Sequence, residues 1–297
     1  FIANQSQSFT IPLSERIPES DKTDTKNLKW IDIKSEVMTQ AGYSANLRAG
    51  VVLPDDYHET LADRRYWPTI YVIPGFGGTH DDAERYARLL SDSSAKGFIP
   101  QAVWIVLNPE SRLGHHGFVN SSNNGPWESA LIDEFIPWLE HRFRLLKPPE
   151  ARIITGHSSG GWTSLWLQLQ HPEVFGACFS SSPDPVSFSH FGVVNLYRDA
   201  NLFVDVDGKP RPSMRVWLRG ELSRVVLTIE DEISMENAIS PNGTSGEQWA
   251  AWNAMFSPRE KSTGLPVMAY DENSGQVNHV VITKDWMSFD IAQMIKR

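Results

Sequence analysis

The chain has 297 residues, of which 40% are hydrophobic and eleven are tryptophan, so it can bury the core of one large domain. Its formal net charge of -9 argues against nucleic acid or an anionic membrane surface as the main partner. One cysteine, Cys178, excludes an intrachain disulfide, and no run approaches the roughly 18 apolar residues that a membrane-spanning helix needs.

Residues 1–27 are polar and are expected to form an arm or linker. The first residue is Phe1 rather than Met, which a cleaved signal peptide would explain, as would other proteolysis or trimming of the chain. We therefore expect a secreted or periplasmic protein. Two strand-like stretches follow, LKWIDIKSEV (28–37) and ANLRAGVVLP (45–54), and the apolar run TIYVI (69–73) predicts a strand buried on both faces.

Strand and helix patterns then alternate along the chain. This alternation predicts an α/β fold, with a doubly wound, mostly parallel sheet and helices on both faces. The predicted helices are 81–93, 128–144 and 160–170, and the predicted strands between and after them are 101–109, 151–156 and 176–182.

The alternation weakens after about residue 184. We expect a core over 28–220, with a last recognisable strand at 214–220. Residues 221–297 are expected to form an irregular insertion or cap region, helical in parts of 221–262 and looped at 240–246, where the sequence is SPNGTSG.

Residues 156–160 read Gly-His-Ser-Ser-Gly and match the G-x-S-x-G pattern between a predicted strand and a predicted helix. Such a sharp turn exposes the central serine, which makes Ser158 the candidate nucleophile. The backbone N–H of Ser159 would stabilise an oxyanion, and the glycine-rich loop after TIYVI offers a second N–H, from Phe76 or Gly77. A tight structural turn without catalytic role is the alternative interpretation. No metal-binding motif is present, because His115 and His116 are adjacent and point apart, and no cofactor is expected.

Several stretches together resemble the family of α/β-hydrolases that includes esterase D-like, feruloyl esterase-like and enterochelin esterase-like proteins. The resemblance implies an α/β-hydrolase fold, Ser158 as nucleophile and the Phe76 region as part of the oxyanion hole. It also implies that Asn124, Gly125 and Trp127 lie near the active-site face, and Gly77 and His157 are further pocket candidates beside the two motifs. The matching stretches, within residues 45–190, are LRAGVVLP, YVIPGFGG, FVNSSNNGPWESALIDEFIPWLEHRF, TGHSSGGW and HPEVFGACFSSSPDPVSF.

The acid and the histidine of a catalytic triad are harder to place. In this fold the chain order is serine, acid, histidine. His279 is the one later histidine whose position fits that order, and Glu221 follows the strand at 214–220, so an internal triad can be written if 265–272 forms a last strand.

The stretch GEQWAAWNAMFSPREKSTGLP instead resembles long bacterial members of the family. That resemblance places Glu221 and His279 in an inserted region and the acid and histidine beyond residue 297. We favour the second reading, in which a C-terminal fragment or a second chain completes the site.

Two functions are compatible with these features. The first is a serine esterase that acts on a small-molecule or polymer-linked carboxylic ester through an acyl-enzyme. The second is a hydrolase-fold subunit used for binding or assembly, without catalysis. Reaction of Ser158 with a fluorophosphonate would distinguish them, because a serine in a purely structural turn would not react.

Overall fold

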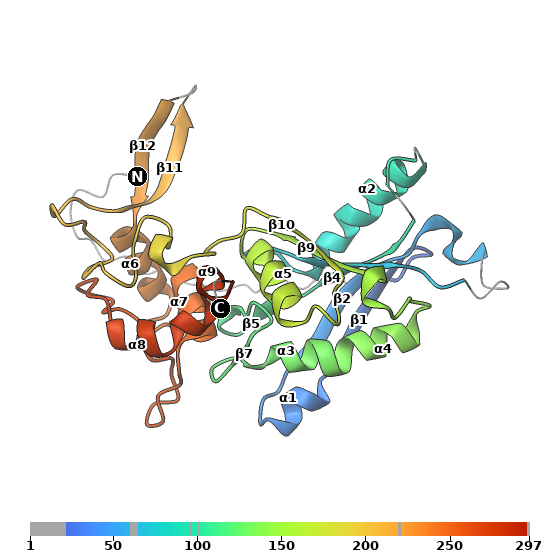
Figure 1. Ribbon diagram of the computed structural model, residues 1–297, viewed down its shortest axis with the longest axis horizontal. Coiled ribbons are helices and arrows are strands. Elements are labelled where there is room, and N and C mark those ends of the chain that lie inside the picture. Colours follow the sequence, from blue (N-terminus) through green and yellow to red (C-terminus); the bar gives the residue numbers. More distant parts are fainter. Residues whose placement is uncertain (1–21, 60–64, 96, 100, 219–220, 296–297) are drawn as a thin grey trace, which may run out of the picture.

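The computed structural model describes residues 22–59, 65–95, 97–99, 101–218 and 221–295. It shows a lobe built on a six-stranded sheet and a second lobe of helices, loops and one hairpin (Figure 1). The predicted arm is described only from Lys22 onward, where the ammonium group of Lys22 pairs with Asp81 and contacts His80. Residues 22–27 are thus attached to the first lobe.

The large sheet has the strand order β1-β2-β4-β3-β9-β10. β4, β3, β9 and β10 are parallel to one another, whereas β1 and β2 are joined to them by antiparallel pairing. The prediction of a mostly parallel sheet is therefore confirmed. Its strands are β1 (Leu28–Lys34), β2 (Asn46–Val52), β3 (Thr69–Ile73), β4 (Val103–Leu107), β9 (Arg152–His157) and β10 (Ala177–Ser181).

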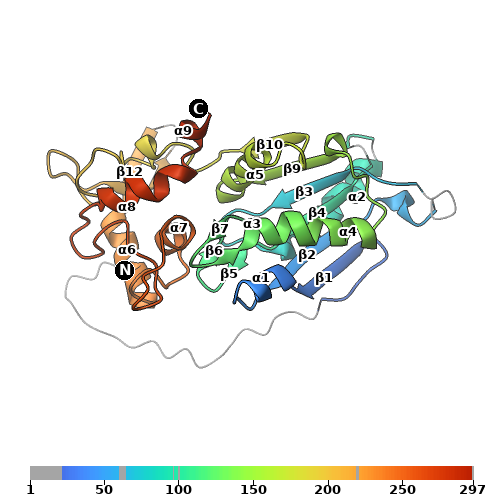
Figure 2. The same ribbon diagram turned by 60° about the horizontal axis from the view of Figure 1, so that its bottom comes forward.

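Alternate side chains on these strands enter different cores. In β3, Tyr71 and Ile73 join the main hydrophobic cluster, whereas Val72 packs on the other face with Ala83 and Leu90 of α2 (Ala83–Ala95). This is the two-residue period of a strand covered on both sides. The main cluster lies under the helical segments that start at Trp127 and Ser159, which cover the face opposite α2 (Figure 2).

The predicted helix at 128–144 is continuous but not uniform. It consists of α3 (Trp127–Ser129), a π-helical segment (Ala130–Phe135) and α4 (Ile136–Arg142). Pro137 explains the irregularity, because proline lacks an N–H and its ring clashes with the carbonyl four residues earlier. The wider π-helical turn lies directly before this proline. The next helix, α5 (Ser159–Gln170), follows β9 as predicted.

The second lobe departs from the predictions in two places. β11 (Pro212–Leu218) forms a two-stranded sheet with β12 (Glu221–Thr228), so it lies in a separate hairpin rather than in the large sheet. β12 also occupies residues for which we expected helix, which begins only when the Thr228 capping box starts α6. Residues 265–272, the expected last strand, form only isolated bridges, Arg259 with Pro266 and Tyr270 with Val277.

The remaining elements are short. None of the helices in the described ranges is long and apolar enough to cross a bilayer. These elements are α1 (Glu36–Gln40), β5 (Glu110–Ser111), β6 (Gly114–His115), β7 (Asn120–Ser121), β8 (Gly125–Pro126), α6 (Ile229–Ile239), α7 (Gln248–Phe256), α8 (His279–Lys284) and α9 (Ile291–Met294).

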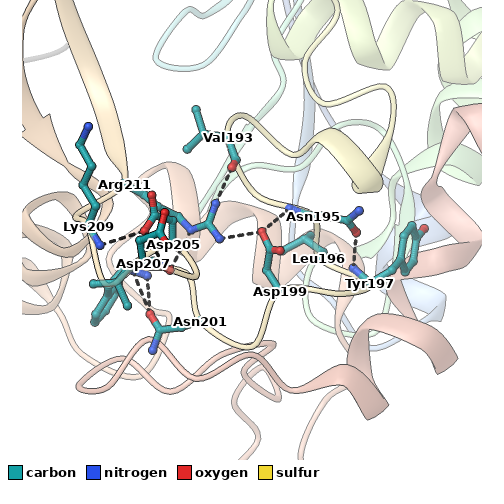
Figure 3. A network of polar contacts seen from close by, with 12 residues as sticks. Val193, Asn195, Leu196, Tyr197, Asp199, Asn201, Asp205, Asp207, Lys209 and Arg211 are labelled. Atoms are coloured by element: carbon teal, nitrogen blue, oxygen red, sulfur yellow. Dashed lines mark hydrogen bonds and ion pairs between the residues drawn. The ribbon is translucent and has the colours of Figure 1, made fainter.

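One arginine organises the segment that joins β10 to β11 (Figure 3). The guanidinium of Arg211 donates to the Val193 carbonyl (2.7 Å), the Val204 carbonyl (3.0 Å) and the Asp199 carboxylate (2.7 Å). Just before it, the carboxylate of Asp205 accepts the N–H groups of Asp207 and Lys209 and so closes a tight turn. These bonds fix the connection from which the hairpin projects.

The two lobes share one hydrophobic core. Trp162 of α5 packs against Phe256 of α7, with ring centroids 5.3 Å apart. Phe256 in turn contacts Trp286 and Phe188, at 5.3 and 5.5 Å. The main cluster therefore runs from the sheet into the second lobe without interruption.

Candidate active site

The turn between β9 and α5 has the geometry that the G-x-S-x-G motif predicts. Ser158 adopts φ 57° and ψ -126°, a conformation that L residues rarely occupy. Two glycines make the turn possible: a Cβ atom at Gly156 would lie 2.2 Å from the Gly160 carbonyl oxygen, and one at Gly160 would lie 2.1 Å from that of Ile73. The N–H of Ser158 donates to the Ser181 carbonyl at 3.0 Å, which ties the turn to the end of β10.

The glycine-rich loop after β3 lies against this turn. A Cβ atom at Gly75 would be 2.9 Å from the His157 carbonyl oxygen and 3.5 Å from the Cβ atom of Ser158. In the described part of the chain, neither the N–H of Phe76 nor that of Ser159 has a hydrogen-bond acceptor. Two backbone donors are thus free on the two segments that meet at Ser158. Gly77, the alternative donor, is exposed with φ 75°.

His115 supports the start of this loop. Its Nδ1 accepts the Gly117 N–H at 3.2 Å, so the ring proton belongs on Nε2, which donates to the Pro74 carbonyl at 3.1 Å. Burial lowers the pKa of His115 to about 4, so the ring is neutral around pH 7. Glu110 pairs with His115 in the β5–β6 hairpin, and burial raises the pKa of its carboxyl to about 7.

A small pocket adjoins Ser159 at the start of α5. It lies between α5, the segment after β10 and helix α7 of the second lobe, which supplies half of the lining. Sequence reasoning missed this contribution, because nothing local in QWAAWNAMF indicates what the helix covers; its nearly unbroken apolar character indicates only burial on all sides. The lining residues are His115, Ser159, Trp162, Asp184, Pro185, Gln248, Ala251, Trp252, Met255 and Phe256.

The other pocket candidates lie elsewhere. Asn124 and Trp127 line a broad groove together with Glu110 and Ser111, and the Ser111 hydroxyl donates to Asn124 at 3.1 Å. Trp127 is buried and stacks on His116 with ring centroids 3.9 Å apart. His157 is exposed, and its Nδ1 lies 3.1 Å from the Ser181 hydroxyl. Asn124, Trp127 and His157 do not line the pocket beside Ser159.

None of the described histidines after Ser158 contacts it. His171 lies between Glu128 (3.2 Å) and Glu173 (3.0 Å), and the Nδ1 of His190 contacts Ser189 at 2.9 Å. His279 begins α8, with its Nδ1 3.2 Å from the Leu196 carbonyl oxygen.

The two strands that the internal triad requires are also absent from the large sheet. Glu221 opens β12 at the outer end of the hairpin, which projects away from α5 in Figure 1. His279 follows residues that form isolated bridges and no strand. The structure therefore does not bring Glu221 and His279 to Ser158. The strand predicted at 214–220 does form, as β11, but it lies in the hairpin, because a hairpin strand and a buried sheet strand carry similar apolar, β-branched sequences. The strand predicted at 265–272 does not form.

With this geometry in view, comparison with known proteins identifies the family. The family described as "Putative esterase" matches residues 43–271, well over half of the chain. The chain belongs to this esterase family. The match confirms the resemblance drawn from residues 45–190 and extends it through β11, β12, α6 and α7 of the second lobe.

The curated relatives that this chain matches include Esterase Rv1288 of Mycobacterium tuberculosis, which is 32% identical over 165 residues, covering 54% of this chain and 32% of the relative. The uncharacterized protein YbbA of Bacillus subtilis is 27% identical over 150 residues, covering 47% and 57%. Among solved structures, a ferulic acid esterase is 19% identical with a TM-score of 0.46, covering 53% of this chain and 61% of its own. The chain spans about a third of the length of the mycobacterial esterase.

Proposed function

We propose that this chain hydrolyses carboxylic esters with Ser158 as the nucleophile. The observation that carries the proposal is the strained backbone of Ser158, held by close-packed glycines between β9 and α5. In the reaction, Oγ of Ser158 attacks the ester carbonyl carbon while its proton passes to a base. The tetrahedral intermediate collapses, the alcohol departs with a proton, and water then releases the acyl group from the serine.

The oxyanion of that intermediate would be held by two backbone groups. The N–H groups of Phe76 and Ser159 have no acceptor among the described residues. Ser159 also starts the twelve-residue helix α5, whose N-terminal dipole end favours negative charge. Because His115 fixes the carbonyl of Pro74, the Phe76 donor is part of a supported loop.

We further propose that the base and the acid come from a segment outside the described residues, in a second chain or fragment. The later described histidines are engaged elsewhere, as shown above. β10 ends the order of the large sheet, so its outer edge can accept another strand. Phe179 on β10 is 67% exposed, and Cys178 beside it is half-buried. A parallel strand added there would end near Ser181, whose carbonyl accepts the Ser158 N–H.

The first test is labelling of the protein with a fluorophosphonate, together with hydrolysis of p-nitrophenyl acetate. Labelling at Ser158 and loss of both signals in Ser158→Ala are the expected results. Intact mass under native and then denaturing conditions shows whether a second polypeptide accompanies the chain. Activity in a preparation that holds this chain alone would refute the proposal of a second chain but not that of the nucleophile.

The alternative is a hydrolase-fold subunit without catalysis. The observation in its favour is that, in the ranges described, no histidine contacts Ser158. Failure of Ser158 to react in the full-length polypeptide and in every complex recovered with it would support this alternative and end the esterase proposal.

A further inference from the structure

The pocket beside Ser159 points to the size of the acyl group that this esterase accepts. We propose that helix α7 restricts the substrate to esters of short acyl groups, about the size of acetyl, and that Met255 sets this limit. The inference rests on the proposed function, because it assumes that the ester carbonyl is held at Ser158.

The position of the pocket assigns it to the acyl group rather than to the alcohol. The oxyanion would point to the N–H groups of Phe76 and Ser159, so the acyl chain and the alcohol must leave the carbonyl carbon in the two other directions. The alcohol has to depart and needs an open path, whereas the acyl chain stays attached until water releases it. Of the two, the acyl chain suits the small pocket that begins at Ser159 and is lined on one side by α7.

The pocket is small and its walls are closely packed. The side chains leave room for about one water molecule, which is close to the size of the methyl group of an acetyl ester. Trp162 and Phe256 are almost fully buried against each other and cannot move apart without breaking the shared core. A longer acyl chain would therefore have to displace a wall of the pocket.

Met255 is the wall residue whose removal would enlarge the pocket most directly. Its side chain is only 6% exposed, and it packs against the backbone of Gly117, where even a Cβ atom would lie 2.2 Å from the Met255 Cε. Methionine usually adapts to its surroundings because its side chain is flexible. Here the thioether lies against the backbone of Gly117, so withdrawal in that direction is blocked.

Helix α7 itself is fixed in place. The carboxylate of Glu236 accepts the N–H groups of Trp249 and Ala250 at its first turn, both at 2.9 Å. Further along, the side-chain carbonyl of Asn253 accepts the Ala269 N–H at 2.9 Å. Sliding α7 away to admit a larger acyl chain would therefore break the hydrogen bonds at Trp249, Ala250 and Asn253.

The test is a series of p-nitrophenyl esters, acetate, butyrate and octanoate, hydrolysed by the full polypeptide in its active form. We expect kcat/KM to fall by roughly tenfold or more from acetate to butyrate, as a pocket that discriminates by methylene groups allows. Met255→Ala should bring butyrate to the level of acetate or above, and Met255→Leu, which keeps the volume, should retain the original preference. Met235→Ala is the matched control, because Met235 on α6 is exposed and does not line the pocket.

The outcomes separate this inference from the proposed function. If no ester is hydrolysed and Ser158 is not labelled, the proposed function fails. If esters are hydrolysed but acetate and butyrate react equally in the unmodified protein, or octanoate is preferred, the acyl limit is wrong while the nucleophile stands. Should Met255→Ala not fold, Trp252→Phe removes volume from the same wall and must widen the chain-length range for the inference to survive.

Discussion

Ser158 carries the clearest signature of the site in its own backbone. A non-glycine residue at φ 57°, ψ -126° costs on the order of 1–3 kcal/mol, and the fold must supply that energy elsewhere. Two hydrogen bonds hold this residue in place: the Ser158 N–H donates to the Ser181 carbonyl, and the Ser158 carbonyl accepts the Trp162 N–H. The strained turn at Ser158 thus lowers the free energy of unfolding of the protein, and this effect can be measured.

Replacing Ser158 by glycine should stabilise the protein. Glycine adopts positive φ without strain, so Ser158→Gly should have a free energy of unfolding about 1 kcal/mol greater than Ser158→Ala, which removes the hydroxyl but keeps the strain. Urea unfolding of the two variants measures the difference. Equal stabilities would mean that the turn is not strained in solution.

Substitutions of Glu221 and His279 should leave the site intact. Loss of a true triad member lowers the rate by about a thousandfold or more. Glu221 opens the hairpin strand β12 and His279 contacts Leu196, so Glu221→Gln and His279→Ala should label with fluorophosphonate as fast as the unmodified protein. A collapse of the labelling rate in either variant would restore the internal triad.

At the scale of elements, helix α7 depends on a buried acid. Glu236 is 6% exposed, and its carboxylate satisfies the N–H groups of Trp249 and Ala250 at the start of the helix. Burial raises its pKa from 4.5 to about 7, although these N–H groups favour the ionised form. The residue that positions the pocket wall therefore titrates near neutral pH.

The stability of the fold should accordingly decrease as the pH rises from about 4.5 to about 7. In that interval the folded protein keeps a proton on Glu236 that the unfolded chain has released, so unfolding becomes easier with rising pH, by at most about 3 kcal/mol. Thermal unfolding at a series of pH values should show a smaller decrease for Glu236→Gln. Glu110→Gln should also reduce the decrease in stability, because burial raises the pKa of Glu110 to about 7 as well, although this residue lies in β5. An unchanged slope in Glu236→Gln would contradict the assignment.

The sequence predicted an element correctly where the residues that determine it lie close together in the chain. The apolar runs of β3, β4 and β9 and the glycines around Ser158 predict the sheet and the elbow, because burial on both faces and a tight turn are local demands on composition. β12 was predicted wrongly because the residues of 221–228 do not show from their own pattern that they pair with the neighbouring strand β11, and residues 265–272 were predicted wrongly because an apolar stretch need not become a sheet strand. The role of α7 at Ser159 is a contact across about ninety positions of the chain, which no local pattern reports.

For the whole molecule, the decisive feature is that its two lobes are not separate folding units. One hydrophobic cluster joins Trp162 of α5 to Phe256 of α7 and Trp286 beyond it. Among the described residues, the sheet that belongs to the second lobe is the two-stranded β11–β12 hairpin, so this lobe depends on the first lobe for burial.

The two lobes should therefore unfold together. Separate domains with small interfaces give separate transitions, whereas a shared core gives one. Scanning calorimetry should show a single peak whose calorimetric and van't Hoff enthalpies agree. Two resolved peaks would indicate that the second lobe folds by itself.

The single thiol on β10 makes the occupancy of this sheet edge measurable by its rate of chemical modification. Cys178 is the chain's one cysteine, and burial raises its pKa, so it reacts slowly with a chromogenic disulfide at neutral pH. A strand laid along β10 would shield that sulfur further. The half-time of the reaction between Cys178 and the chromogenic disulfide would then report, without any substrate, whether a strand from another segment or chain occupies this edge.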